Sequence, residues 1–247
     1  METVTLDFKN YKTTHLCGCD EISEKKKQNW LKNHMQDGVI YRRTTEGENF
    51  MEYMPTEDAW CPVEAPQTMF IHAFQTKDNP KAAKVLLREC IADCRIKGRQ
   101  GLAAMVCDEK RPYLPQASLL ESLNFHKCDT FEHYHLYFLP LEEETVIPKF
   151  SVKEKNRPKD QGLVIYYSQQ CPEILSRLEK IFQWARVCSH PHKIVAVDIP
   201  REKEDMDRED IIRPQEMPWP YTIYAVFWNS QFLTDDITKD LTTLLPK

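Results

Sequence analysis

The residues from Asp78 to Lys84 have the composition of a helix start that could bind phosphate. Asp78-Asn79-Pro80 stands between an apolar run and an amphipathic one, which predicts a turn followed by a helix. Pro80 suits the first helical position, and Asp78 or Asn79 suits the capping position before it. Helix N-termini present free N–H groups to phosphate, and Lys81 and Lys84 would add positive charge. The alternative is an ordinary capped helix with solvated lysines.

Cys171 is a second candidate for chemistry, because it directly precedes Pro172 at an expected helix start. A helix N-terminus favours the thiolate form of cysteine. Two-cysteine exchange would need another thiol three residues later, where Ile174 stands, and Cys188 lies at the far end of the expected helix. A monothiol role and a purely structural cysteine both remain open.

A strand, helix and strand surround the first of these helix starts. Met69 to Phe74 is a nearly continuous apolar run, which predicts a strand covered on both faces. The following segment keeps apolar residues at helical spacing until Gly98, and Gly101 opens a second apolar strand that ends at Val106. Two strands joined by a crossover helix are expected to be parallel, with a right-handed connection.

The flanking elements predict a mixed α/β architecture with a mixed sheet. The helix before the hairpin is expected to bury Ile22, Trp30, Leu31 and Met35 beneath a lysine-rich surface. The expected elements are an edge strand over Thr3–Phe8, a helix over Glu21–Gln36, a hairpin of Val39–Thr44 and Asn49–Met54, a helix over Gln116–Leu123, and a strand pair of Phe125–Asp129 and Tyr134–Leu139.

Two domains are predicted, over residues 1–141 and 161–247, with the charged, proline-containing segment 142–160 as a linker. In the second domain we expect a buried strand over Leu163–Tyr167, a helix from Pro172, a parallel strand over Ile194–Ile199, a third strand over Thr222–Phe227, a short fourth strand, and a closing helix over Asp235–Leu245.

The composition indicates a soluble globular protein, with 41% hydrophobic and 29% charged residues and a formal net charge of -5. Such a balance argues against nucleic acid or anionic membranes as general partners. Without a span-length apolar run or a signal-peptide core, a cytoplasmic location is expected. Nine scattered cysteines suit reduced thiols. Cys17-Gly18-Cys19 has no second pair at zinc-site spacing, so no metal is expected.

Several short tracts carry a resemblance that covers nearly the whole chain. They are Ala59-Trp60-Cys61-Pro62-Val63-Glu64-Ala65, Cys128-Asp129-Thr130, Gly162-Leu163-Val164-Ile165-Tyr166-Tyr167, Gln170-Cys171-Pro172, Tyr221-Thr222-Ile223-Tyr224-Ala225-Val226-Phe227 and Phe232-Leu233-Thr234. With these tracts and the order of its elements, the first domain resembles the GNAT superfamily of acyl-CoA-dependent N-acetyltransferases. The second resembles the YoaP-like domain, a thioredoxin-like module found fused behind such enzymes.

The resemblance implies direct transfer of an acyl group from acetyl-CoA, or a related acyl-CoA, to an amine of a small molecule or peptide. The family signature before the helix is Gln/Arg-x-x-Gly-x-Gly/Ala; here Lys81 stands where glycine is expected and only Ala83 fits. The cosubstrate would lie along the central strand, with its phosphates at the helix start. The residues so implied are Phe74, Gln75, Thr76, Asn79, Lys81, Ala82, Ala83 and Lys84.

Such a transfer needs a base for the acceptor ammonium and, often, an acid for the departing thiolate. Glu64, in the loop before the central strand, is the candidate base, and His72 is the alternative; a surface glutamate and a buried core histidine are the ordinary interpretations. The family's acidic tyrosine position holds Leu120, so Tyr113 is the substitute if its loop covers the cleft. Otherwise solvent protonates the thiolate.

Two other functions compete with the acyltransferase. One is a binding protein that keeps the fold without CoA or turnover, and the other is a monothiol module centred on Cys171.

Overall fold

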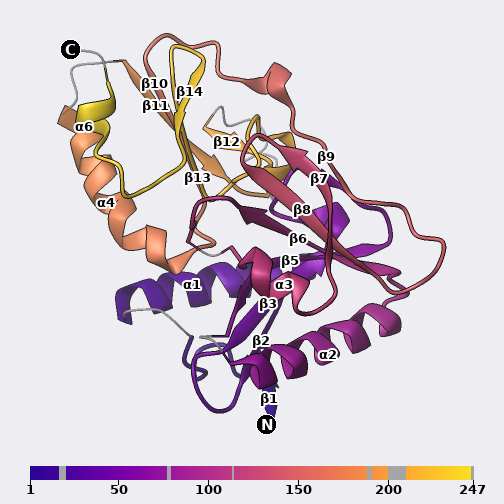
Figure 1. Ribbon diagram of the computed structural model, residues 1–247. Coiled ribbons are helices and arrows are strands. Elements are labelled where there is room, and N and C mark those ends of the chain that lie inside the picture. The colour runs from indigo at the N-terminus through magenta and orange to yellow at the C-terminus, as the bar shows by residue number, and fades with distance from the viewer. Residues whose placement is uncertain (17–20, 77–78, 113, 188–190, 200–209, 246–247) are drawn as a thin grey trace. The chain divides into compact units, whose positions relative to one another are not determined.

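The structure is a computed structural model (Figure 1) that describes residues 1–16, 21–76, 79–112, 114–187, 191–199 and 210–245. The chain divides into two compact units, one of Met1–Ala59 with Val63–Ser151 and one of Trp60–Pro62 with Val152–Lys247. The division falls inside segment 142–160, and Trp60–Pro62 belongs to the second unit although its sequence lies in the first half. Within the described ranges, no helix is both long and apolar enough to cross a membrane.

A seven-stranded sheet forms the first unit, in the spatial order β1-β2-β3-β5-β6-β8-β7. Neighbouring strands are antiparallel except β5 and β6, which are parallel as predicted from the apolar runs and their crossover helix. The strands are β1 (Thr3–Thr5), β2 (Ile40–Thr44), β3 (Phe50–Pro55), β5 (Thr68–Gln75), β6 (Gly101–Cys107), β7 (His126–Phe131) and β8 (Tyr134–Pro140). The predicted hairpin and the closing strand pair are confirmed.

Helix α2 (Pro80–Ile96) covers one face of this sheet and forms the main core with it. Its apolar stripe packs against alternate residues of the strands, as the 3.6-residue and two-residue periods require. The stripe residues are Ala83, Leu86, Leu87, Cys90 and Cys94. Gly98 follows the helix at a φ of +65°, the left-handed conformation that ends helices at low steric cost.

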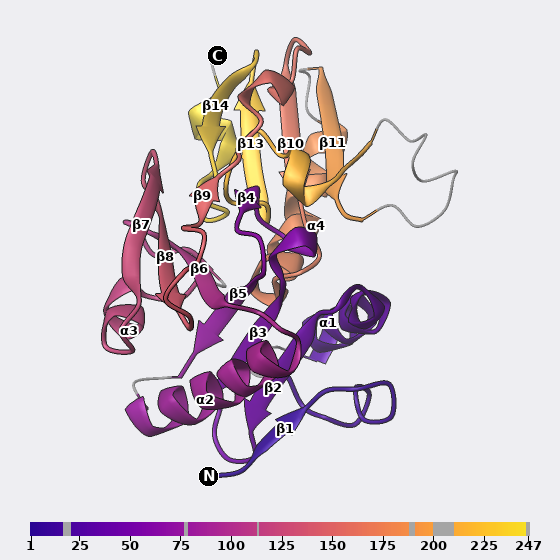
Figure 2. The same ribbon diagram turned by 90° about the vertical axis from the view of Figure 1, so that its right-hand side faces the viewer.

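Helix α1 (Glu21–His34) covers the opposite face, and strands β2 and β3 pass between α1 and α2 (Figure 2). The predicted inner face of α1 is wrong in part: Trp30 and Leu31 are buried, but Ile22 is 71% exposed and Met35 lies beyond the helix in a 3-10 turn, η1 (Met35–Asp37). The residues that face inward are Ser23, Lys27, Trp30, Leu31 and His34. Two of the buried polar residues have charged partners: Lys27 pairs with Glu52 of β3, and His34 pairs with Asp37 of η1.

The remaining elements of the first unit are short. They are η2 (Thr56–Asp58), α3 (Ala117–Glu121), and a separate two-stranded ladder of β4 (Val63–Glu64) with β9 (Lys149–Phe150). This ladder ties the Glu64 segment to the end of the first unit.

The second unit has a five-stranded sheet in the order β12-β11-β10-β13-β14. Its elements are η3 (Glu154–Asn156), β10 (Leu163–Tyr167), α4 (Pro172–Val187), β11 (His192–Val197), β12 (Ile211–Ile212), η4 (Pro214–Glu216), β13 (Tyr224–Trp228), β14 (Gln231–Thr234) and α6 (Leu241–Leu244). Strand β11 is parallel to β10, as predicted, and β13 is antiparallel to it.

The predicted closing helix over Asp235–Leu245 is shortened to the single turn of α6. Asp236 accepts a hydrogen bond from the N–H of Thr238 at 2.9 Å, and Asp240 accepts one from the N–H of Thr242 at 2.9 Å. These side chains hold turn and cap conformations that compete with a continuous helix.

Candidate active site

The two parallel strands of the first unit separate part of the way along their length. Their ladder runs from Thr68–Gly101 to Ile71–Ala104 and ends there, although β5 continues to Gln75 and β6 to Cys107. We call this opening the fork. Beyond the fork the facing edges of the two strands do not pair with each other, so their backbone groups need other partners.

A β-bulge lies at the first residue beyond the fork. On the other edge of β5, Glu52 of β3 pairs with Ala73, whereas Tyr53 pairs with Ile71. His72 is therefore the extra residue, opposite no residue of β3. Bulges bend a strand and redirect side chains, which accounts for the departure of β5 from β6 at this point.

A buried ion pair lies on the α1 face of the sheet, beside this bulge. The Lys27 Nζ of α1 lies 2.6 Å from Glu52 Oε2, with side chains 1% and 0% exposed. The same Nζ lies 4.0 Å from the ring centroid of Trp30. An ammonium held by a carboxylate and an aromatic face is a cation site, here occupied by a side chain of the protein.

His72 faces the same cluster. Burial, followed by the charge of Lys27, lowers the pKa of His72 to about 3. Its imidazole is consequently neutral at physiological pH and a weak base there. The ordinary interpretation of His72 as a buried histidine agrees with its position, and the carboxylate of Glu52 is the charged acceptor in the cluster.

The start of α2 has fewer open N–H groups than the sequence led us to expect. Asn79 is the cap: its Oδ1 accepts from the N–H of Ala82 at 3.0 Å, and its carbonyl accepts from the N–H of Ala83 at 3.0 Å. Pro80 has no N–H. The expectation that Ala82 and Ala83 offer amides to phosphate is thus wrong, since Asn79 already satisfies both. No described residue accepts a hydrogen bond from the backbone N–H of Lys81.

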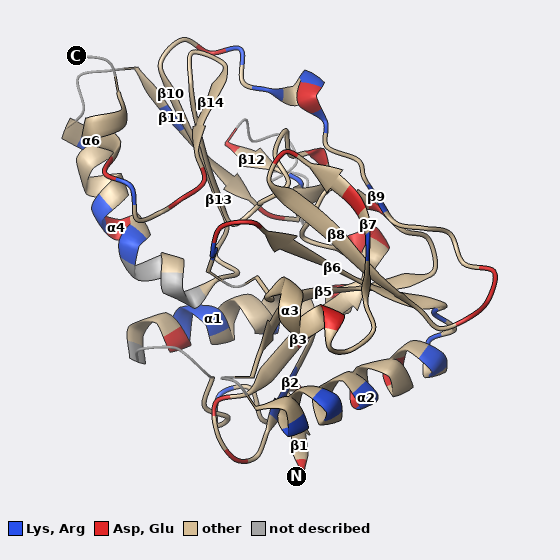
Figure 3. Cartoon of the chain, viewed as in Figure 1, with Lys and Arg blue, Asp and Glu red and all other residues tan. Residues whose placement is uncertain are grey.

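Positive side chains take the place of these amides. Lys81, Lys84 and Arg88 are exposed on one side of the first turns of α2, and with Pro80 and Val85 they line a hollow of about 440 Å³. Figure 3 shows the blue residues following each other along the helix. Lys84 and Arg88 also border a second hollow of about 640 Å³ that reaches Leu123 and Leu139. We call the two hollows, which share Lys84 and Arg88, the α2 groove; Arg88 also pairs with Glu89 at 3.2 Å.

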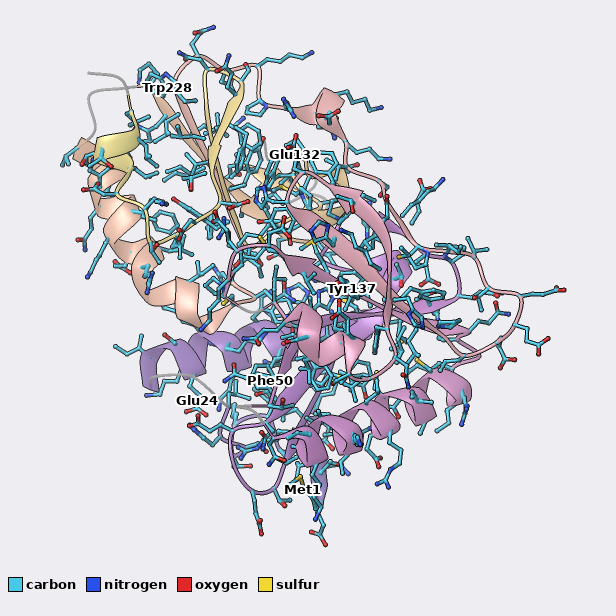
Figure 4. The ribbon with its side chains drawn as sticks, viewed as in Figure 1. Met1, Glu24, Phe50, Glu132, Tyr137 and Trp228 are labelled. Carbon is cyan, nitrogen blue, oxygen red and sulfur yellow. The ribbon has the colours of Figure 1, made fainter. Side chains whose placement is uncertain are left out.

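Tyr137 lies on the α2 face of the sheet, at the level where the β5–β6 ladder ends. It pairs across the ladder with Ala104, the last residue of β6 that pairs with β5. Its hydroxyl donates a hydrogen bond of 2.9 Å to Glu121 Oε1 of α3. Figure 4 labels Tyr137 between α3 and the central strands. Burial, followed by the Glu121 carboxylate, raises the pKa of Tyr137, so the hydroxyl keeps its proton.

The other residues singled out from the sequence have varied positions. Glu64 is exposed in the β4–β9 ladder, 3.2 Å from Lys149 Nζ, and not in the seven-stranded sheet. Phe74 is buried in the core beneath α2, and Gln75 is the last residue of β5. The carbonyl of Thr76 accepts a hydrogen bond of 2.7 Å from the N–H of Asn79. Cys171 precedes α4 as predicted and is 0% exposed.

Tyr113, Asp78 and Cys188, like Cys17 and Cys19, lie outside the described residues. Lys27, Glu52, Arg88 and Tyr137 were not identified from the sequence. The available signals were a charged residue inside the apolar strand Phe50–Pro55, and the helical spacing of Arg88 from Lys81 and Lys84.

The fold and the site define a class: a mixed α/β protein whose central sheet opens between two parallel strands, beside a cationic helix start. No protein-family model matches the chain. It is similar to an uncharacterized N-acetyltransferase, YoaP, of Bacillus subtilis strain 168, with 28% identity over 222 residues, which are 87% of this chain and 83% of that protein.

Solved structures of acetyltransferases are also similar. A putative GNAT-family acetyltransferase from Desulfovibrio desulfuricans has 15% identity and a TM-score of 0.40, covering 57% of this chain and 100% of that one. The putative acetyltransferase yncA from Salmonella typhimurium, solved with its cofactor acetyl-CoA, has 12% identity and a TM-score of 0.33, covering 50% of this chain and 77% of that one.

Proposed function

We propose that this chain is an N-acetyltransferase of the GNAT kind, which transfers the acetyl group of acetyl-CoA to an amine of a small molecule or peptide. The observation that carries the proposal is the fork between β5 and β6 with the cationic start of α2 beside it. The similarity to YoaP over 87% of the chain supports it.

In this proposal the pantetheine arm lies along the edge of β5 at Phe74, Gln75 and Thr76, where strand backbone is open beyond the fork. The diphosphate lies at Lys81, Lys84 and the following Arg88. Three side-chain cations compensate for the missing glycines, because phosphate binds ammonium and guanidinium groups through charge-assisted hydrogen bonds. Asn79, Ala82 and Ala83 act indirectly, by building the capped turn that presents these cations.

The acceptor amine would approach from the α1 face, where Glu52 lies beside the bulge. We propose Glu52 as the proton acceptor, because its register places it next to the fork. Glu64 stays a competing prediction, and its exposed position in the β4–β9 ladder makes Glu64→Gln the matched comparison for a base assignment. A direct attack on the thioester then needs no covalent enzyme intermediate.

Tyr137 is the proposed acid for the departing thiolate, in the role that the sequence assigned to Tyr113. The family position for this tyrosine holds Leu120, whose side chain is buried in the core. Tyr137 reaches the same α3 side of the fork from β8, and Glu121 orients its hydroxyl. A tyrosine with a raised pKa holds its proton until the thiolate forms.

Tyr137→Phe is expected to lower kcat about 100-fold while leaving acetyl-CoA binding unchanged, because general acids contribute roughly that factor or more. The measurement is CoA thiol release under saturating acetyl-CoA with a primary-amine acceptor selected from a panel. Glu121→Gln removes the carboxylate charge that raises the pKa of Tyr137, so the alkaline limb of kcat should move to lower pH. An unchanged kcat in Tyr137→Phe would assign the proton transfer to solvent.

Calorimetric titration with acetyl-CoA tests the function itself. We expect saturable binding with a Kd below about 1 mM, the usual range for enzyme substrates, and thiol release when a primary amine is added. Absence of binding at saturating acetyl-CoA would reject the enzyme and leave a CoA-free binding protein.

For the second unit we propose a thioredoxin-like fold. The parallel pair β10–β11 around α4, followed by antiparallel β13 and β14, is the strand order that supports this assignment. A monothiol role for Cys171 is less well supported than the acyltransferase, because the similarity over most of the chain is to an N-acetyltransferase.

A further inference from the structure

Helix α1 turns one lysine toward the sheet while its neighbours face water. Lys25 and Lys26 are exposed, whereas Lys27 is 1% exposed. Lysine side chains normally extend their ammonium into solvent. The same helix leaves the apolar Ile22 71% exposed, so the orientation of α1 favours burial of an amine over burial of an available isoleucine.

A carboxylate and an aromatic ring lie against the ammonium of Lys27. Its Nζ lies 2.6 Å from the Glu52 carboxylate and 4.0 Å from the centroid of Trp30. The Lys27 charge also lowers the pKa of His72, in the same direction as burial. Because β3 and β5 pair through Glu52 and Ala73, the whole cluster lies on the α1 face within a residue of the bulge.

This location coincides with the acceptor side of the fork. His72 is the first β5 residue beyond the last pair with β6, and the pairing fixes Glu52 next to it. If acetyl-CoA lies in the fork, as proposed above, its thioester carbon approaches the sheet at this point. Lys27 then offers an amine of the chain itself on the α1 face.

We propose that Lys27 is a self-acetylation site, on which the chain transfers acetyl from acetyl-CoA to its own ε-amine. The inference rests on the proposed function. The Lys27 ammonium gives a proton to Glu52, and the neutral amine attacks the thioester carbonyl carbon. A nitrogen–carbon bond forms and the carbon–sulfur bond breaks. Of the two protons that the nitrogen loses, one leaves through Glu52 to solvent and the other balances protonation of the thiolate to CoA–SH.

Acetylation changes the cluster in a defined way. The amide carries no charge, so the ion pair with Glu52 is lost and the cation over Trp30 disappears. Acetylation therefore removes the charge-assisted contact between Lys27 and Glu52.

Peptide mapping by mass spectrometry tests the inference. The full chain is incubated with acetyl-CoA and sampled over time, and the occupancy of each lysine is compared. Exposed Lys25 and Lys26 report spontaneous chemical acetylation in the same peptide region. The expected result is acetylation of Lys27 about 10-fold or more faster than of these neighbours; burial protects Lys27 from spontaneous modification, so only transfer by the chain itself would give this order.

Two variants complete the test. Lys27→Arg keeps the positive charge and removes the reactive amine, and it should lose this rapid acetylation while binding acetyl-CoA as the parent does. Lys26→Arg, at an exposed position, should retain it. If only Lys25 and Lys26 are modified while acetyl-CoA binding and transfer to an amine are intact, the self-acetylation of Lys27 is overturned. The proposed acetyltransferase function is then unaffected. A chain that binds no acetyl-CoA would overturn both.

Discussion

Reversing the charges of Lys84 and Arg88 together is expected to weaken acetyl-CoA binding about 100-fold, the equivalent of two charge-assisted contacts of about 1.5 kcal/mol each. Both side chains border both hollows of the α2 groove. The N–H groups of Ala82 and Ala83 are already bonded to Asn79. Binding of the phosphates therefore depends on side-chain cations more than on the helix amides. Calorimetric titration of the double variant Lys84→Glu/Arg88→Glu measures the change in the dissociation constant for acetyl-CoA.

The matched control places the same charge change elsewhere. Lys97 follows α2 and Lys127 lies in β7, and both are exposed. Neither lysine borders the hollows of the α2 groove. Lys97→Glu/Lys127→Glu should bind acetyl-CoA within a few-fold of the parent, because salt screens exposed charges that do not contact the ligand. Equal loss in both double variants would show that net charge, and not the groove, governs binding. Melting temperatures should change little in either variant.

Lys27→Met is expected to destabilise the first unit by about 3–5 kcal/mol, because it leaves the carboxylate of Glu52 buried without its ion-pair partner. Both side chains are almost fully buried, so solvent cannot replace the lost ammonium without opening the α1 contact. Hydrogen exchange of the β3 and β5 amides measures the effect within the sheet itself, independently of the second unit.

The double variant Lys27→Met/Glu52→Leu should recover most of this loss, since two apolar side chains of similar volume can replace a buried ion pair at small net cost. The difference between the variants isolates the pair from the packing of each residue. A single variant as stable as the parent would mean that Glu52 has another compensating charge. If the double variant regains stability but loses acetyl transfer, the Lys27–Glu52 pair serves the reaction and not the stability of the fold.

These two predictions test opposite sides of the same strands. In the proposed function the cations of α2 bind the donor, and the Lys27–Glu52 pair faces the acceptor. Strand β5 separates them, with Phe74 in the α2 core and His72 toward Lys27. The bulge makes this division possible, because it places two successive residues, His72 and Ala73, between core positions Ile71 and Phe74.

The sequence predicted the repeating parts of the fold well. The apolar run that became β5 and the 3.6-residue stripe of α2 are local patterns, and their order implied a parallel β5–β6 pair. Strand β10 was predicted with the same bounds that the structure has. The Asn79–Pro80 helix start was also recognised, including the possibility that Asn79 simply caps the helix. Periodicity and capping depend on residues a few positions apart, so one sequence contains them.

The polar cluster beside the bulge could not be predicted from the sequence, for a physical reason. Hydrophobicity assigned Ile22 to the core side of α1 and Lys27 to water, and the structure reverses both. A buried lysine is stable only when a carboxylate meets it, and Glu52 is 25 positions away along the chain, in another element. Glu64 was chosen for its place in the chain, yet β4 pairs with β9 and not with the central sheet.

The sequence alone determined which segments are strands and helices, and that β5 and β6 run parallel around α2. Only the tertiary structure decided where those strands part, that His72 forms the bulge, and that Lys27, Glu52 and Tyr137 flank the opening. The reason is that register and burial are set by contacts between distant segments. Local patterns specify the elements, but the pairing of those elements determines which polar side chains meet.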